Sequence, residues 1–459
     1  MSARDHVPTM LVAGLSSAFG VGLLAATEVI VSLVAADDGI GSVGAVRTVV
    51  SITASVFIAI AVYVAAVVTT NTVATIVAGR TREIALARLL GATAASRRRA
   101  LAREGLLAGG AGALIGAGAG VGIVVLGTGI AVRADVLPDI EFGFLSWTMV
   151  LPILGVALTT WLAAWVGSRR VLDVSPMAAL GAAVPASAES IARRTGRRVV
   201  SALLFWSGTA LLAAAVPIGL LSPYALFIGV LGGILSFTGV VLGAVFVIPP
   251  ALRLVGRVAG RGTAGRLGAA NAVRYPERSS RAAIGLVIGV ALVTMFVVAA
   301  ETARRILLVQ AEASWGTTEP IDETLNALMT IFGFLVGYSA VIAAVGLVNT
   351  LTVGVLQRTR EFGLLRALGF TREQVRATVM SEAAQLTVTA IALGLVLGIG
   401  YGWVGAIALL GQEGVQPPVV PWWLLVGVAV VAAVLTAAAS VVPANRAARL
   451  APVAALAVQ

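Results

Sequence analysis

Two acidic side chains inside long apolar runs are the residues that could give this chain a chemical preference. Glu28 lies in the first apolar run and Glu301 lies in a later one. At about 1.5 Å of rise per helical residue, both carboxylates fall near the outer boundary of a bilayer, at matching depths. They would then line an outward vestibule that favours a cationic or amphipathic passenger. Alternatively, both are interfacial residues in reach of water.

Other reactive side chains are scarce, which excludes several classes of chemistry. The 459 residues include no Cys, no Lys and a single histidine, His6. Disulfides, thiolate or histidine-based zinc sites and a Ser-His-Asp triad are therefore not expected. A phosphate-binding loop of the GxxxxGK[ST] type needs a lysine. We therefore predict a chain that is not an enzyme, with no catalytic, cofactor or metal site and no ATP site of its own.

The composition places the chain in a membrane. Hydrophobic residues make up 59% of it and charged residues 12%, and several apolar runs exceed the roughly 18 residues that indicate a bilayer span. We expect an all-α polytopic membrane protein with ten transmembrane helices, arranged as four, two and four. The predicted spans are about 10–36, 49–76, 105–131, 147–166, 199–220, 224–248, 282–300, 325–351, 383–410 and 421–442.

One stretch of the chain occurs twice. Residues 71–104 and 349–382 align without a gap at a constant offset of 278, with fourteen identical positions. A repeat this long indicates duplication of a whole transmembrane half. Each copy predicts a short helix that ends at Gly91 or Gly369, with Thr93 or Thr371 as the N-cap of the next span.

The repeat divides the chain into four parts. Residues 1–180 form the first four-helix half, and 181–252 a linker with an inserted two-helix hairpin. Residues 253–281 are expected as an amphipathic segment on the cytoplasmic membrane face, and 282–459 form the second half. The outer intervals, about 37–48 and 302–323, are too short to fold as independent domains.

Arginine distribution predicts the orientation. With the N-terminus inside, 28 arginines face the cytoplasm and four face outward, namely Arg47, Arg133, Arg304 and Arg305. Arginines that flank transmembrane helices are found mostly on the cytoplasmic side of the membrane. We expect a multi-pass protein of the plasma membrane with both termini and both repeat loops in the cytoplasm.

Glycines recur in the third span of each half. Small residues let transmembrane helices approach closely. We therefore predict helix-packing roles for Gly112, Gly116, Gly118, Gly120, Gly122, Gly394, Gly398 and Gly400.

The chain resembles the permease subunits of the FtsX/MacB-like ABC transporter superfamily, particularly the ten-span permeases of high-GC Gram-positive bacteria. The resemblance covers nearly the full length. It rests on RTREFGLLRALGFTREQVR and its first-half copy, the glycine-rich spans that follow, NAVRYP at 271–276 and the closing PANRAARLAPVAAL.

The resemblance implies a partner. In that family the loop between the second and third spans of each half is a coupling helix on a cytoplasmic ABC ATPase, and two ATPases serve one assembly. ATP and Mg²⁺ would then bind the partner, and membrane lipid and an amphipathic substrate are further expected partners, without nucleic acid. The implied coupling residues are Arg82, Glu83, Leu86, Arg88, Leu90, Gly91, Thr93, Arg360, Glu361, Leu364, Arg366, Leu368, Gly369 and Thr371.

Three functions remain open at this point. The first is the permease of an ATP-driven exporter of hydrophobic or amphipathic compounds such as a peptide, lipid, drug or haem-like molecule. The second is a mechanical transmitter that regulates an extracellular partner such as a cell-wall hydrolase, against which the short outer loops weigh. The third is an ion-coupled carrier, for which a relay of acids in mid-membrane would be expected.

Overall fold

Helices make up every regular element in the part of the chain that the structure describes. The computed structural model describes residues 7–36, 94–135, 137–167, 195–259, 276–316 and 369–431, with single residues between 52 and 70 and at 270, 325, 333, 433 and 434. The elements are α1 (Val7–Ala36), α4 (Ala94–Arg133), the 3-10 helix η2 (Trp147–Met149), α5 (Val150–Gly167), α8 (Thr195–Gly219), α9 (Ala225–Ala259), α11 (Pro276–Trp315), α14 (Arg372–Leu410) and the 3-10 helix η4 (Gly411–Glu413).

The predicted all-helical membrane class is confirmed. Within the described ranges, six helices are long and apolar enough to cross a bilayer: α1, α4, α8, α9, α11 and α14. Two shorter apolar helices, Trp147–Leu162 and Trp422–Val431, coincide with the predicted fourth and tenth spans. Most of the predicted second and eighth spans, 49–76 and 325–351, lies outside the described residues. The count of ten therefore stays a prediction.

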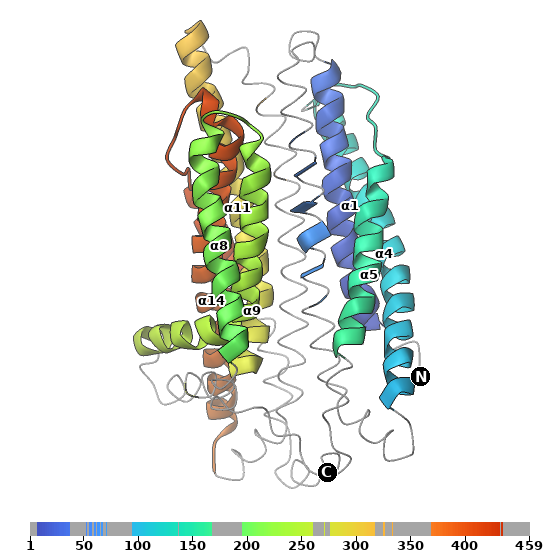
Figure 1. The fold of residues 1–459 in the computed structure, drawn as a ribbon, viewed down its shortest axis with the longest axis vertical. Coiled ribbons are helices and arrows are strands. Elements are labelled where there is room, and N and C mark those ends of the chain that lie inside the picture. Colours follow the sequence, from blue (N-terminus) through green and yellow to red (C-terminus); the bar gives the residue numbers. More distant parts are fainter. Residues whose placement is uncertain are drawn as a thin grey trace.

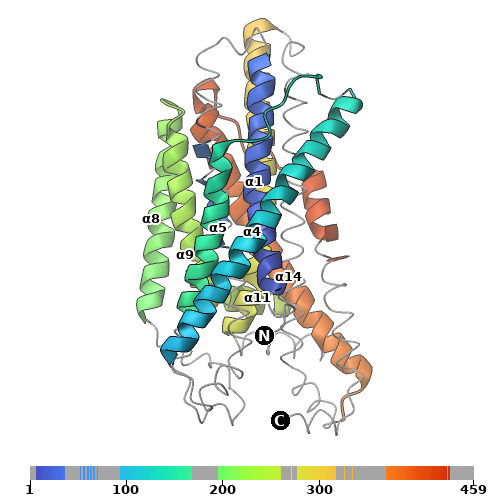
Figure 2. The ribbon, with the colours of Figure 1, turned by 90° about the vertical axis from the view of Figure 1, so that its right-hand side faces the viewer.

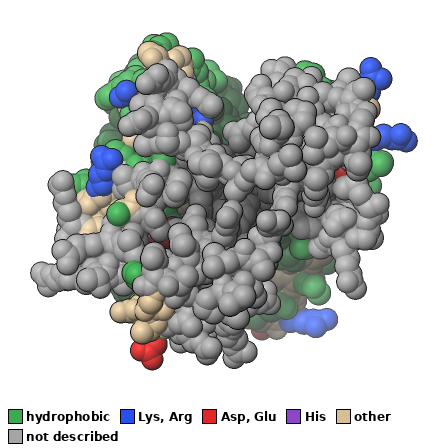
Figure 3. Space-filling view, turned by 90° about the horizontal axis from the view of Figure 1, so that it is seen from below, with side chains coloured by type: hydrophobic (Ala, Val, Ile, Leu, Met, Phe, Trp, Pro, Cys, Tyr) green, Lys and Arg blue, Asp and Glu red, His purple; other side chains and the backbone are tan. Residues whose placement is uncertain are grey.

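The helices form two groups that stand side by side. Figure 1 shows α1, α4 and α5 on one side and α8, α9, α11 and α14 on the other, with the described helical residues between 52 and 70 in the middle. α1, α4, α8, α11 and α14 all begin at the lower end (Figures 1 and 2). Seen from that end, arginine side chains of the described residues lie around the edge of the molecule (Figure 3).

Glycines allow the backbone of α4 to pack directly against the backbone of α1. α4 crosses α1 obliquely (Figure 2). A Cβ added at Gly112, Gly116 or Gly120 would clash with backbone atoms of α1, at Gly116 with the carbonyl group of Gly14. Residues four apart share one helix face, so these three glycines form one continuous contact strip.

The second half repeats this arrangement with α14 against α11. A Cβ at Gly394 would lie 2.7 Å from the Cβ of Val290, and one at Gly398 would lie 2.5 Å from the Cβ of Thr294. Gly402, which the sequence analysis did not single out, makes the same kind of contact. The described residues do not show the packing role predicted for Gly118, Gly122 and Gly400, since a Cβ there meets none of their atoms within 4 Å.

α11 is longer than the sequence indicated. The span was expected to end near residue 300 and to give way to a loop over 302–323, but the helix continues to Trp315. The sequence between Thr302 and Ser314 contains no Gly or Pro, so charge there does not stop the helix. Gly316, at φ +69, ends it, and its N–H donates to the carbonyl of Glu312 at 2.9 Å.

The predicted cytoplasmic segment 253–281 shares residues with two helices. α9 continues through Arg253 to Ala259, and α11 already begins at Pro276. Pro249 and Pro250 lie inside α9, where they remove two backbone donors and kink the helix. Figure 1 shows the last turns of α9 running across the axis of the bundle.

Replacing Gly116 by Ala tests the α1–α4 contact. Its methyl group would meet the Gly14 backbone, so we expect a loss of about 1–3 kcal/mol of stability and a lower thermal midpoint in detergent. Gly118→Ala on the same helix is the matched control, because its methyl group meets open space. Equal midpoints for the two variants would contradict this contact.

Candidate functional site

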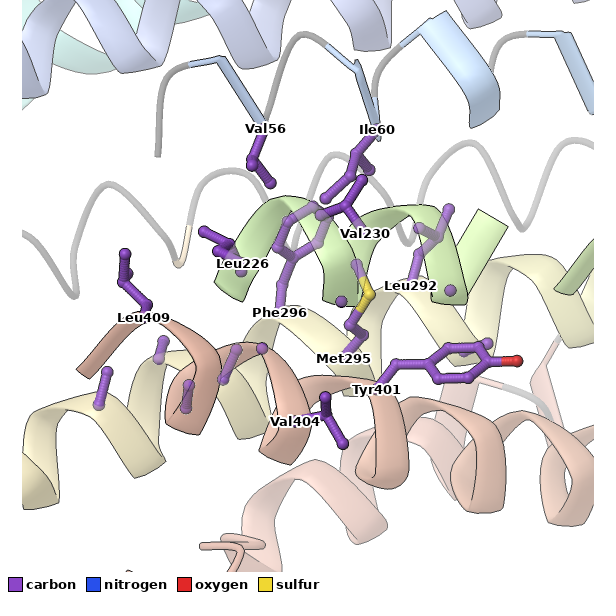
Figure 4. A pocket seen from close by; sticks show the side chains of 18 of the residues that line it. Val56, Ile60, Leu226, Val230, Leu292, Met295, Phe296, Tyr401, Val404 and Leu409 are labelled. Carbon is purple, nitrogen blue, oxygen red and sulfur yellow. The ribbon is translucent and has the colours of Figure 1, made fainter. Parts of the chain in front are cut away.

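An apolar cavity of about 330 Å³ lies where the two groups of helices meet. Its walls come from α1, the described residues between 56 and 67, α8, α9, α11 and α14. Figure 4 shows Val56 and Ile60 facing Val230 of α9, Phe296 of α11 and Val404 of α14 across it. Ligand pockets in proteins have volumes of about 300–1,000 Å³ and mostly apolar walls, so this cavity fits a small apolar ligand or chain.

Three aromatic rings lie together at one end of the cavity. The rings of Tyr63 and Tyr401 each meet Phe237 edge-on, with centroids 6.5 and 6.4 Å apart. The Tyr63 hydroxyl shares a hydrogen bond of 2.8 Å with Thr238, and the Tyr401 hydroxyl one of 3.0 Å with Ser236. Both partners belong to α9, so this helix is hydrogen-bonded to both halves of the chain.

Arg304 is the charged residue among the described residues that line the cavity, at the other end from the aromatic rings. Arg304 lies about 14 Å beyond Met295 along the axis of α11, at about 1.5 Å of rise per residue. The residue is half-buried. Its Nε atom is buried and has no hydrogen-bond partner in the part of the chain that the structure describes.

The inserted hairpin closes the cavity against the second half. The described contacts of α8 and α9 are mainly with each other, α11 and α14. A Cβ at Gly219, where α8 ends, would lie 2.5 Å from the carbonyl oxygen of Ile407. The side-chain amide of Gln412 donates to the carbonyl of Leu221 in the hairpin turn. The hairpin is therefore part of the site.

The two predicted vestibule acids lie next to the cavity without lining it. Glu28 and Glu301 are both half-exposed, whereas their neighbours Thr27 and Ala300 are buried and line the wall. The carbonyl oxygen of Glu28 accepts a hydrogen bond from Ser32 at 2.9 Å. A shared vestibule for this pair stays a prediction.

Of the predicted coupling residues, the structure describes Gly369 and Thr371. Gly369 has φ +91, a conformation that glycine adopts without strain. Thr371 is the N-cap of α14, as predicted: its Oγ1 accepts from the N–H of Gln374 at 3.2 Å, and the Gln374 Oε1 accepts from the N–H of Thr371 at 2.9 Å. The other coupling residues, 82–93 and 360–368, lie outside the described residues.

Sequence reasoning missed the residues that form the cavity. Tyr63 and Tyr401 occur in apolar spans, and an isolated tyrosine there carries no signal that its ring meets a third ring. Arg304 was assigned to an outer loop because its charge interrupts the apolar run. A prediction that continued the helix through Arg304 would have placed this residue on α11.

The described residues define a helical membrane protein with two related halves around an apolar cavity. Comparison of the sequence with known protein families identifies its family. The FtsX-like permease C-terminal family matches residues 55–176 and 326–452, together more than half of the chain. Each match contains one copy of the repeat. The chain belongs to this family and is an FtsX/MacB-like ABC transporter permease.

Several relatives share parts of the chain. It is 33% identical over 136 residues to the uncharacterized ABC transporter permease YknZ of Bacillus subtilis, which covers 30% of this chain and 33% of YknZ. It is 32% identical over 152 residues to the pyoverdine export ATP-binding/permease protein PvdT of Pseudomonas aeruginosa, covering 33% of this chain and 21% of PvdT. The macrolide export ATP-binding/permease protein MacB of Nitrosomonas europaea is 28% identical over 134 residues, covering 29% of this chain and 19% of MacB. The chain therefore spans a third or less of these relatives.

Removing the Thr371 cap tests how the second loop joins α14. Thr371→Ala leaves first-turn N–H groups without an acceptor, at a cost of about 1 kcal/mol. We expect faster hydrogen exchange in the first turn of α14, measured by mass spectrometry. Thr371→Ser keeps the hydroxyl and should retain protection; equal exchange in the two variants would show that the cap is not needed.

Proposed function

We propose that this chain is the transmembrane permease subunit of an ATP-driven exporter for hydrophobic or amphipathic compounds, energised by a separate ATPase subunit. The names of two relatives, a pyoverdine export protein and a macrolide export protein, support export of this kind. Both relatives are named ATP-binding/permease proteins. These 459 residues contain no lysine and so no phosphate-binding loop of the GxxxxGK[ST] type, and we propose that ATP binds to a separate subunit.

The position of α14 is the observation that supports this proposal most directly, because this helix joins the repeat loop to the cavity. It starts at the Thr371 cap directly after the loop and runs unbroken to Leu410, which lines the cavity together with Tyr401. At about 1.5 Å per residue, the cap lies about 45 Å from the Tyr401 level. Because α14 is one continuous helix with a capped first turn, displacement of the loop would shift one wall of the cavity.

The remaining architecture belongs to the same proposal. We propose ten spans in a four, two, four layout, cytoplasmic termini, and one ATPase under each repeat loop, two in all. The equivalent glycine contacts of α4 and α14 support two similarly moving halves. Among the described helices, the hairpin packs mainly against α11 and α14 of the second half.

Copurification tests the coupling assignment. The chain would be expressed together with the products of its neighbouring genes, and we expect an ATP-binding subunit to copurify with it. Replacing both Glu83 and Glu361 by Arg reverses the charge in each predicted docking helix, and like charges across an interface oppose binding. We expect recovery of the ATPase subunit to fall by about tenfold.

The matched control is Glu413→Arg, an exposed charge reversal in η4 at the opposite end of α14. It should leave copurification unchanged. Undiminished recovery with the Glu83 and Glu361 double variant would refute the docking assignment, and absence of any ATP-binding partner with the unaltered chain would refute the proposed function.

A further inference from the structure

We propose that the cavity binds an anionic amphiphile with one apolar chain, whose carboxylate or phosphate head is held by Arg304. The proposal of a binding site is argued from the described residues of this chain alone. The role of such a molecule as exported passenger rests on the proposed function above.

The shape of the cavity favours a single extended chain. On α11 its lining residues recur from Ile288 to Leu307, over about 28 Å of helix at about 1.5 Å per residue. A volume of about 330 Å³ spread along several helical turns is narrow. A flexible alkyl chain fits such a space, whereas a bulky ring system needs a wider one.

Arg304 supplies the charge that would orient the chain. A guanidinium group stays protonated in proteins, and an unpaired charge away from water is costly. Glu301 lies three residues earlier on the same helix, a spacing that allows ion pairs. No ion pair joins the two in the described part of the chain, and the Arg304 Nε remains unpartnered. The Nε–H group of Arg304 is thus available to an anion at this end of the cavity.

Among the described residues, acids do not compete with this assignment. No acidic residue is among the described residues that line the cavity, and Glu28 and Glu301 lie beside it. The charge that the described lining presents to a bound molecule is therefore positive. An anionic head is favoured over a cationic one at this position, because a charge-assisted hydrogen bond to Arg is stronger than a neutral one.

The opposite end of the cavity suits the end of an apolar chain. The hydroxyl groups of Tyr63 and Tyr401 are engaged by Thr238 and Ser236 of α9. Their rings, together with Phe237, present apolar surface to the cavity. A polar head would find no free partner in this ring cluster, so the ligand has one favourable orientation, with its head at Arg304.

Equilibrium binding of radiolabelled dodecanoate tests the proposal. The full chain would be held in nanodiscs of zwitterionic phosphatidylcholine, without an ATPase. We expect saturable binding, displacement by unlabelled dodecanoate or dodecyl phosphate, and about tenfold weaker displacement by the neutral 1-dodecanol. Comparison of the two anions tells whether the site prefers a carboxylate or a phosphate head.

Two pairs of variants locate the site. Arg304→Gln should weaken binding by about tenfold, whereas Arg305→Gln, at the adjacent exposed arginine that does not line the cavity, should not change it. Gly405 lines the cavity, and a Cβ there meets no atom within 4 Å, so Gly405→Leu should fill the space and abolish binding. Gly400→Leu on the same helix also points into open space but outside the cavity, and should bind normally.

Equal binding by the two arginine variants, or equal displacement by dodecanol, would overturn the role of Arg304. Unchanged binding by Gly405→Leu would overturn the cavity as the site. Because no ATPase is present, these results are independent of the copurification test: loss of the ATPase partner would refute the permease function and leave the binding site intact.

Discussion

Backbone-to-backbone packing at glycines is the contact on which both halves of this permease depend. Lipid tails solvate an apolar helix about as well as another helix does, so close van der Waals contact has to hold the bundle together. Gly116 on α4 and Gly398 on α14 provide that closeness against α1 and α11. The same device in both halves gives each a tightly joined helix pair, and the cavity lies between these pairs.

The second half combines the two features that the proposed coupling requires. α14 has a capped start beside the repeat loop and a far end in the cavity wall, with glycine contacts to α11 between them. Arg304 lies on α11, the helix to which α14 is bound. A displacement of α14 would therefore act on the helix that carries the proposed head-group contact. The hairpin adds a third wall through the Tyr401–Ser236 hydrogen bond.

The predictions succeeded where they used a local rule. Thr371 is an N-cap because a Thr-x-x-Gln pattern satisfies orphan N–H groups at that spot, whatever the rest of the fold does. Gly118 and Gly122 make no such contact with the described residues, because the prediction counted glycines without asking which face of the helix each one occupies. α11 was cut short because charge was taken as the end of a helix, although helix propensity continues to Gly316.

Residue type and order were enough to predict the membrane class, the repeat and the family, since hydropathy and repeat identity depend on no long-range contact. The cavity could not be predicted from the sequence in this way. Its walls come from residues as distant as Thr27 and Leu410, and depth in the bilayer does not tell which face of a helix a side chain occupies. Glu301 and Arg304 have nearly the same depth, and packing places the arginine in the cavity wall and the glutamate beside it.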